Sequence, residues 1–304
     1  MPSLAGRAAR LVGLDQADLI AWSVRWRSVF PHRGFREHQR VPLWHPDVPF
    51  VLITSQKAGS TFGTSWFFRH AGLLSKARAH HPFVHRFEQE VFLRQPGYFR
   101  GLEAALGTRK VIKLVRDPGA RAFSSYLALC TTEVLDNPRD HRIAIRRRIA
   151  KSQGIGRDAR APISLTHFLA WVAGQDHRRL DGHEARQANL YEDRLPQGRP
   201  EALHLEEVHK DIPRLESRLG LPETPAEELG RLGVSGHHVS KVEDDPQTVR
   251  QIIEHGVELP RKGRQPRITS ATFALFPEAR GYLFRAYGKD YDRYGYILPK
   301  AGGS

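Results

Sequence analysis

The feature that most constrains the fold is a strand–turn–helix pattern that occurs twice, about sixty residues apart. The apolar runs FVLIT (50–54) and VIKLV (111–115) predict buried strands. Helical spacing of apolar residues follows each run, over 64–74 and 120–129. Buried strands that alternate with helices favour a parallel sheet. We therefore expect an α/β fold of three layers, with a mostly parallel central sheet flanked by helices.

The remaining elements are expected to belong to one domain that spans residues 1–304, because one core can be supported at this length. Residues 1–45 are predicted to form an N-terminal helical segment. The strongly basic residues 137–162 predict an exposed helix and a flexible connector, and the Pro- and Gly-rich residues 222–267 predict loops. The regions 131–162 and 222–267 are expected to shape a substrate site. Further elements are predicted as a helix over 163–173 with Ser164 as its N-cap, a strand over 202–208, and helices over 210–221 and 269–288.

The charge balance points to an anionic partner, because the net charge is +14. Nucleic acid, a polyanionic glycan, a membrane surface and a phosphorylated cofactor all carry suitable charge. The single cysteine, Cys130, excludes an intrachain disulfide and suits a reducing compartment. No apolar run reaches the length of a membrane span, and the N-terminal residues show no signal peptide. We expect a cytoplasmic protein without stable membrane insertion.

The first candidate anion site is the turn after residues 50–54, with the sequence QKAGST (56–61). Gly59 allows positive φ, and the helix that follows directs its free N–H groups at the turn. Lys57 adds a mobile charge, and Ser60 and Thr61 add hydroxyl donors. This predicts a P-loop-like phosphate-binding turn, although a Walker A lysine would follow the second glycine. The alternative is a plain strand–helix loop with an incidental lysine.

The second candidate site follows residues 111–115. Arg116 stands at the predicted carboxyl end of that strand, where ligands of open parallel sheets bind. Arg121, Ser124 and Ser125 come three and four residues apart, on one face of the predicted helix. A guanidinium can donate two parallel hydrogen bonds to a phosphate dianion. The alternative is a surface Arg–Asp pair before a serine-rich helix start.

Together the two segments resemble the signatures of sulfotransferases that use 3′-phosphoadenosine 5′-phosphosulfate (PAPS). Lys-[Ser/Ala]-Gly-[Thr/Ser]-[Thr/Ser] matches 57–61, and Arg-x-Pro-x-x-Arg-x-x-Ser-x-Tyr matches 116–126. The resemblance implies that the first segment holds the 5′-phosphosulfate, and that Arg116 and Ser124 bind the 3′-phosphate. It also implies that Lys57 stabilises charge on the leaving phosphate. The implied PAPS contacts are Lys57, Ala58, Gly59, Ser60, Thr61, Phe62, Arg116, Ser124, Arg261, Lys262 and Gly263.

Weaker similarity extends toward the branch of the family that sulfates carbohydrates. HEARQ (183–187) resembles a His-x-x-Pro-Gln stretch of that branch, with Arg186 in place of Pro, and implies an acceptor contact by His183. The ending KDYDRYGYIL also resembles this branch. Residues 261–263 match the start of an Arg-Lys-Gly-x-x-Gly motif that closes over the 3′-phosphate in the cytosolic branch. Position 266 is Pro rather than Gly, and a charged loop explains these residues equally well.

The resemblance implies a metal-free, in-line sulfuryl transfer to an acceptor, for which a base must take the acceptor proton. In this family the base comes from the region after the first helix, here 78–92. We rank His85 first and Glu90 second, and expect His81 to contact the acceptor. As a strand, the alternation of Phe83, His85 and Phe87 would place all three on one face. With sixteen histidines in the chain, most must serve on the surface or in packing.

Two other classes of protein stay open at this point. A P-loop-like nucleotide kinase or hydrolase would need magnesium and a lysine after the glycine. A non-catalytic, basic nucleic-acid- or glycan-binding protein is supported by the basic stretch 142–160, although charge runs are usually solvated faces. For the sulfotransferase we expect a small-molecule or glycan acceptor and no nucleic acid. The identity of the acceptor and the oligomeric state cannot be read from the sequence.

Overall fold

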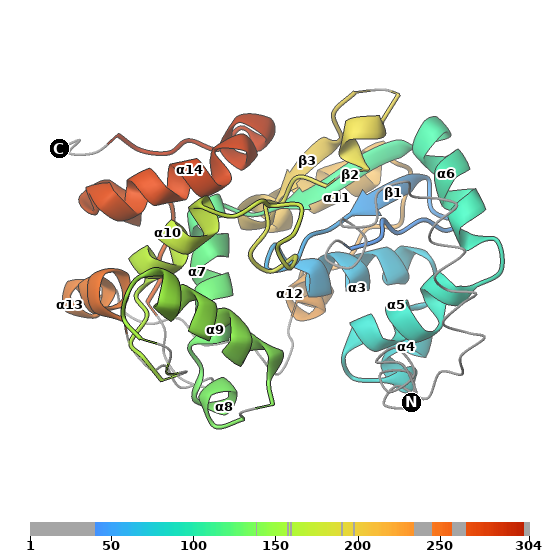
Figure 1. The fold of residues 1–304 in the computed structure, drawn as a ribbon. Helices are drawn as coiled ribbons and strands as arrows, with labels where there is room; N and C mark the ends of the chain where they lie inside the picture. The colour runs from blue at the N-terminus through green and yellow to red at the C-terminus, as the bar shows by residue number, and fades with distance from the viewer. Residues whose placement is uncertain are drawn as a thin grey trace, which may run out of the picture.

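The computed structural model describes residues 40–137, 139–156, 158, 160–189, 191–196, 198–233, 245–256 and 266–300. Within these residues a parallel sheet has the order β1–β2–β3 (Figure 1). Its strands are β1 (Phe50–Ile53), β2 (Lys110–Val115) and β3 (Glu201–His204). Phe50 pairs with Lys110, and Ile112 pairs with Glu201. The predicted α/β class, with a parallel sheet flanked by helices, is confirmed.

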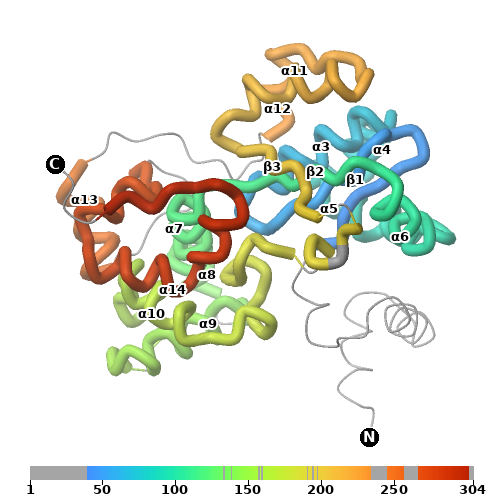
Figure 2. Tube along the Cα trace, turned by 90° about the horizontal axis from the view of Figure 1, so that it is seen from above, coloured from blue at the N-terminus to red at the C-terminus, as the bar shows by residue number. Residues whose placement is uncertain are grey.

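The helices form two groups that lie side by side in both views (Figures 1 and 2). The first group surrounds the sheet and consists of α3 (Ser60–His70), α4 (Leu74–His80), α5 (Val84–Glu90), α6 (Tyr98–Thr108), α11 (Val208–Arg218) and α12 (Ala226–Leu232). The second group consists of α7 (Pro118–Leu129), α8 (Thr132–Leu135), α9 (His141–Ser152), α10 (Leu165–Ala173), α13 (Pro246–Arg250) and α14 (Pro277–Tyr294). Because α7 follows β2 directly, the end of β2 lies where the two groups meet.

Each group has its own hydrophobic cluster. In the first cluster the ring of Trp66 stacks on Phe50 with the centroids 5.0 Å apart, so α3 packs directly on β1. In the second cluster Tyr126, Phe168 and Leu283 join α7, α10 and α14, and all three are fully buried. Such aromatic and aliphatic burial is the main stabilising contribution in both groups. That residues 1–304 form a single domain stays a prediction.

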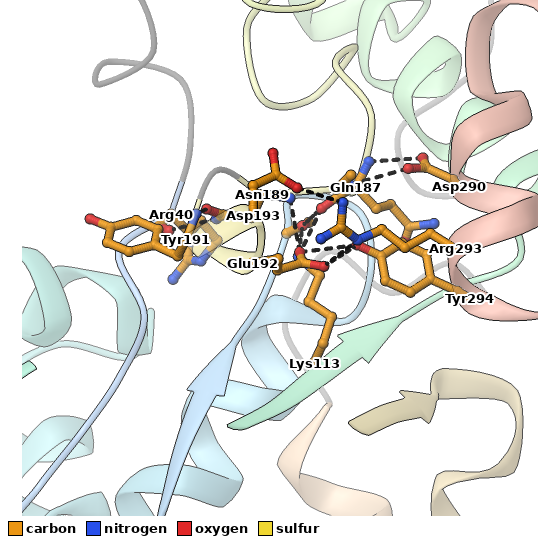
Figure 3. Close-up of polar contacts among 12 residues, drawn as sticks. Arg40, Lys113, Gln187, Asn189, Tyr191, Glu192, Asp193, Asp290, Arg293 and Tyr294 are labelled. Carbon is orange, nitrogen blue, oxygen red and sulfur yellow. Dashed lines mark hydrogen bonds and ion pairs between the residues drawn. The ribbon is translucent and has the colours of Figure 1, made fainter. Parts of the chain in front are cut away.

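A buried lysine interrupts the apolar strand β2. The side chain of Lys113 is fully buried, and its ammonium donates to Ser55 Oγ and to Gln187 O, both at 2.8 Å. It also forms an ion pair with Glu192 Oε1 at 3.1 Å (Figure 3). Three donors thus meet three acceptors, which is the condition under which a charge is tolerated in a core. Lys113 therefore joins the end of β1 to the segment around 187–192.

Several predicted boundaries were wrong. The helix predicted over 64–74 begins at Ser60 and ends at His70. The strand predicted over 202–208 ends at His204, and a short 3₁₀ turn over Leu205–Glu207 leads into α11. The helix predicted over 269–288 begins only at Pro277, after a 3₁₀ turn. Proline at the first helical position explains this start, because its fixed φ suits a helix while it has no N–H to donate.

The exposed helix predicted within 137–162 is confirmed as α9, whereas the loops predicted over 222–267 were wrong in their described part. Residues 131–162 contain α8 and α9, and residues 222–267 contain α12 and α13 followed by a π-helical turn over Gln251–His255. That these regions shape a substrate site stays a prediction. Of the predicted N-terminal helical segment, residues 1–39 lie outside the described residues. Residues 40–45 are not helical, and Leu43 forms an antiparallel bridge with Leu52.

The contact between the start of α7 and Ser270 leaves no room for a side chain at Gly119. A β-carbon there would lie 2.5 Å from the backbone N of Ser270, whereas one at Gly281, inside α14, would meet nothing within 4 Å. Gly119→Ala should lower the free energy of unfolding by about 1 to 3 kcal/mol. Gly281→Ala should raise it by about 0.5 to 1 kcal/mol. Urea unfolding curves measure both, and equal effects would contradict this packing.

Candidate functional site

The turn between β1 and α3 contains two residues in the left-handed region. Gly59 has φ 78° and precedes the first residue of α3, and a β-carbon there would lie 2.6 Å from Leu205 Cδ1. Lys57 has φ 63°, and it is the only non-glycine residue with positive φ in the described part of the chain. Lysine adopts this conformation at a cost, which the surrounding contacts must offset. The turn directs the first N–H groups of α3 toward Lys57 and its neighbours.

Several positive charges surround the Lys57 ammonium. Burial is the largest cause that lowers the pKa of Lys57 to about 8, and the charges of Arg116 and Arg142 lower it further. Glu184 acts in the opposite direction. Within the described ranges, the Lys57 ammonium makes no hydrogen bond or ion pair. An anion bound here would raise the pKa of Lys57 again and would be held by a compact cationic group.

The second predicted segment meets this turn directly. Arg116, the residue after β2, donates from Nη1 to the carbonyl of Lys57 at 3.1 Å. Arg121, in the first turn of α7, donates from Nε to the carbonyl of Gln56 at 3.0 Å. The structure thus brings together two segments that are separated by about sixty residues in the sequence.

Some polar side chains of α7 are occupied by hydrogen bonds within the protein, and one is available for a ligand. Arg121 is 1% exposed, and its Nη2 donates to Gly182 O at 2.8 Å. Its guanidinium therefore links the backbone at Gln56 to the backbone at Gly182. Ser125 Oγ donates to backbone carbonyls, one of them that of His183. Ser124 is half-buried, and its side chain forms no hydrogen bond with the described residues. Of the hydroxyls predicted on this helix face, Ser124 is therefore the one available for a ligand.

His85 lies against the same turn from the side of α5. Its Nε2 is 3.3 Å from Thr61 Oγ1 and 3.5 Å from Ser60 Oγ. Its Nδ1 is 2.7 Å from Glu88 Oε2, and the guanidinium of Arg40 contacts both partners. A carboxylate beside one ring nitrogen fixes the ring orientation and leaves the other nitrogen directed at the turn.

The charges of this pair suit proton transfer. Burial lowers the pKa of His85 and the Arg40 charge adds to the effect, so the imidazole is neutral at pH 7. Burial alone would raise the pKa of Glu88, but the charge of Arg40 and the hydrogen bond with His85 outweigh it and lower that pKa. The result is an ionised carboxylate against a neutral imidazole.

The predicted strand around His85 was wrong, because the residues form α5 instead. His85 and Phe87 are buried, whereas Phe83 precedes the helix and is 39% exposed, so the three do not share a face. His81 also lies outside α5, and its Nδ1 accepts a hydrogen bond from Phe83 N at 2.9 Å. An alternation of only three residues was too short to separate a strand from a helix.

The structure does not bring every predicted residue to the turn. Glu90 lies on the exposed side of α5, where it pairs with His80 at 3.0 Å and with Arg86 at 3.0 Å. In the described part of the chain, Glu90 forms no hydrogen bond or ion pair with Lys57 or Thr61. Residues 261–263 lie outside the described residues. Ala58 and Phe62 are buried beside the turn and support it from within.

His183 lies close enough to the turn for its titration to respond to Lys57. Its Nδ1 is 2.6 Å from Asp181 Oδ1. Although 46% of the His183 side chain is exposed, partial desolvation is the largest cause that lowers its pKa, and the Lys57 charge contributes to the lowering. The segment 181–184 is held to α7 through Arg121 and Ser125.

Glu184 is a candidate site residue that sequence reasoning missed. Its side chain is 3% exposed, and Oε2 has no hydrogen-bond partner among the described residues. Burial, followed by the charge of Asp181, raises the pKa of Glu184 to about 8, while Arg121 and Lys57 act against the rise. At pH 7 the group is therefore a neutral acid. No sequence signal distinguishes Glu184, because its burial depends on segments far away in the chain.

Two further structural observations concern metal ions and membranes. Among the described residues, no group of three or more His, Cys, Asp or Glu side chains is arranged to hold a metal ion. None of the helices described here combines the length and the apolar character that a membrane crossing requires.

Comparison with known proteins adds no identification. No family model, no curated protein and no solved structure matches this chain.

The neutral state of Glu184 predicts a pH-dependent effect of Glu184→Gln. In the unfolded state Glu184 loses its proton near pH 4.5, whereas in the folded state it keeps the proton up to about pH 8. The free energy of unfolding of the wild type therefore falls as the pH rises through this window. Glutamine does not titrate, so Glu184→Gln removes this contribution to the pH dependence of the free energy of unfolding. The variant should match the wild type near pH 5 and be more stable by about 1 to 3 kcal/mol near pH 8.

Urea unfolding at the two pH values measures the effect. Glu103→Gln, on the exposed side of α6, is the matched control and should show no such change. A stability difference between wild type and Glu184→Gln that is the same at both pH values would contradict the assignment.

Proposed function

We propose that this protein is a PAPS-dependent sulfotransferase that transfers the sulfuryl group to a hydroxyl of an acceptor, most simply a carbohydrate. One observation carries the proposal. Arg116 donates to the carbonyl of Lys57, so the two segments that match the family signatures are in direct contact. A nucleotide with phosphates at both the 3′ and 5′ positions needs two anion sites held at a fixed spacing.

In this proposal the turn at 57–61 acts as a P-loop-like cradle for the 5′-phosphosulfate. The N–H groups at the start of α3 and the hydroxyls of Ser60 and Thr61 donate to its oxygens. Arg116 and Ser124 bind the 3′-phosphate, for which Ser124 has a free hydroxyl among the described residues. Phe62 and Ala58 support the cradle, and residues 261–263 are proposed to cover the 3′-phosphate.

The proposed chemistry is an in-line displacement at sulfur. The acceptor oxygen forms a bond to sulfur while the bond between sulfur and the bridging phosphate oxygen breaks. The acceptor proton moves to His85 Nε2, and the electron pair of the broken bond stays on the phosphate. Lys57 stabilises that developing charge, while Glu88 stabilises the imidazolium that forms.

Two alternatives fit the residues less well. A P-loop-like kinase or hydrolase would need the lysine after the glycine, whereas Lys57 comes before Gly59. A basic binding protein for nucleic acid or glycan would use the exposed charges of α9 but has no need of the buried pair of His85 and Glu88. We also propose a cytoplasmic location, because the chain has a single thiol, that of the buried Cys130, and so forms no intrachain disulfide.

Arg116→Ala should weaken binding of adenosine 3′,5′-bisphosphate by about 10- to 100-fold, because a charge-assisted hydrogen bond contributes about 1.5 to 3 kcal/mol. Adenosine 5′-phosphate, which lacks the 3′ group, should bind the variant and the wild type almost equally. Isothermal titration calorimetry without added metal measures both affinities.

Arg100→Ala removes an exposed positive charge on α6 and is the matched control, with little effect expected. An Arg116→Ala variant that binds the bisphosphate as tightly as wild type would overturn the assignment. So would a wild-type protein that is stabilised against heat by ATP with magnesium, or by short DNA, but not by the bisphosphate.

Lys57→Ala should lower kcat for sulfuryl transfer by roughly 100- to 1000-fold, because Lys57 acts mainly on charge that develops in the transition state. Binding of the bisphosphate should weaken far less. Lys57→Arg should restore little activity, because a planar fork does not replace a compact ammonium. Transfer of labelled sulfate from PAPS to a panel of hydroxyl acceptors provides the assay.

Lys76→Ala, on the exposed side of α4, is the control and should retain full activity. Transfer should also persist in EDTA, because Lys57 supplies the charge that a metal ion supplies in kinases. Near-normal turnover in Lys57→Ala, or loss of transfer in EDTA, would contradict the proposed mechanism.

A further inference from the structure

The backbone of Arg116 is held by a side chain rather than by a strand. Gln187 Oε1 accepts a hydrogen bond from Arg116 N at 2.9 Å, and Gln187 Nε2 donates to Arg116 O at 2.7 Å. One amide group thus satisfies both backbone groups of a single residue. Gln187 is 1% exposed, and Arg116 is half-buried.

This contact lies at the point where the sheet ends. The pairing of β2 with β3 stops at Val115, which is opposite His204. Arg116 is the next residue, and β3 has no further strand residue to pair with it. Gln187 therefore takes the place of the missing strand partner. Without it, two backbone groups at the end of the sheet would lose their protein partners, and the backbone of Arg116 would no longer be fixed.

Gln187 is itself fixed on both sides. Its N–H donates to Asp290 Oδ2 at 2.8 Å, and its carbonyl accepts from Lys113 Nζ at 2.8 Å and from Ser55 Oγ at 2.9 Å. Figure 3 shows this network between β2, the segment 187–193 and α14. Asp290 also accepts a hydrogen bond from the N–H of Ala188 at 3.1 Å. These hydrogen bonds fix the backbone of Gln187 and thereby the position from which its side-chain amide reaches Arg116.

The other end of Arg116 is fixed as well, because its Nη1 donates to Lys57 O. With the backbone and one terminal nitrogen fixed, the guanidinium loses little conformational freedom when it binds an anion. Preorganisation of this kind increases affinity without adding a contact to the ligand.

We propose that Gln187 is a positioning residue that sets the selectivity of the site for nucleotides with a 3′-phosphate, by holding the backbone of Arg116. The inference rests on the proposed function, because it uses the assignment of Arg116 to the 3′-phosphate. Gln187 itself touches no part of the nucleotide in this account.

Gln187→Ala removes both hydrogen bonds to Arg116, and Gln187→Met removes them while nearly preserving the side-chain volume. Each variant should bind adenosine 3′,5′-bisphosphate about tenfold more weakly than wild type. Affinity for adenosine 5′-phosphate should hardly change, and this binding also reports that the variant is folded. Gln175→Ala, at an exposed position, is the matched control and should leave both affinities unchanged.

A double-mutant cycle separates positioning from a general structural role. Gln187→Met should cause no further loss of bisphosphate affinity when Arg116 is already alanine, because its effect acts through that side chain. A loss of about tenfold that persists in the Arg116→Ala background would overturn the inference. Equal weakening of both nucleotides by Gln187→Met would overturn it as well.

The failure of this inference differs from the failure of the proposed function. If wild type prefers the bisphosphate and Gln187→Met retains the full preference, the positioning role is wrong and the sulfotransferase assignment stands. If wild type binds the two nucleotides equally, the assignment of Arg116 to a 3′-phosphate is wrong, and the inference is overturned with it.

Discussion

The buried ammonium of Lys113 is the interaction on which the arrangement of the candidate site depends. Its three acceptors lie on Ser55, just before the turn, on Gln187, and on Glu192. Glu192 accepts in turn from the hydroxyl of Tyr294 on α14. A charge in a core is stable only when such acceptors surround it, so the lysine and its partners must form together. One side chain of β2 thereby joins the sheet to the second group of helices.

The electrostatic character of the candidate site follows from the way these contacts bring charged side chains together at the end of the sheet. Burial lowers the pKa of Lys57, and Arg116 and Arg142 lie close enough for their charges to lower it further. The nearby carboxyl of Glu184, whose Oε2 has no hydrogen-bond partner among the described residues, keeps its proton at neutral pH. The surface that remains is positive and suits a ligand with more than one negative charge. On its other side, the neutral imidazole of His85 suits a proton that leaves an acceptor.

Local patterns predicted much of the fold. The strands predicted over 50–54 and 111–115 are observed over 50–53 and 110–115, and Ser164 caps α10 as predicted. Short apolar runs and caps can be predicted because they depend on neighbours in the chain. Long-range contacts were not predictable in the same way. Arg121 was expected to face an anion, but its fork binds carbonyls of Gln56 and Gly182. The same limit applies to the partners that Glu88, Glu184 and Gln187 find only after folding.

The central claim is that the two segments form one site for a nucleotide with phosphates at its 3′ and 5′ positions. A crystal structure of the protein with adenosine 3′,5′-bisphosphate tests it most directly. We expect the 5′-phosphate at the start of α3, within hydrogen-bonding distance of the backbone N–H groups of Ser60 and Thr61. We expect the 3′-phosphate against the guanidinium of Arg116 and the hydroxyl of Ser124. A nucleotide bound elsewhere, or with its two phosphates in exchanged positions, would contradict the account.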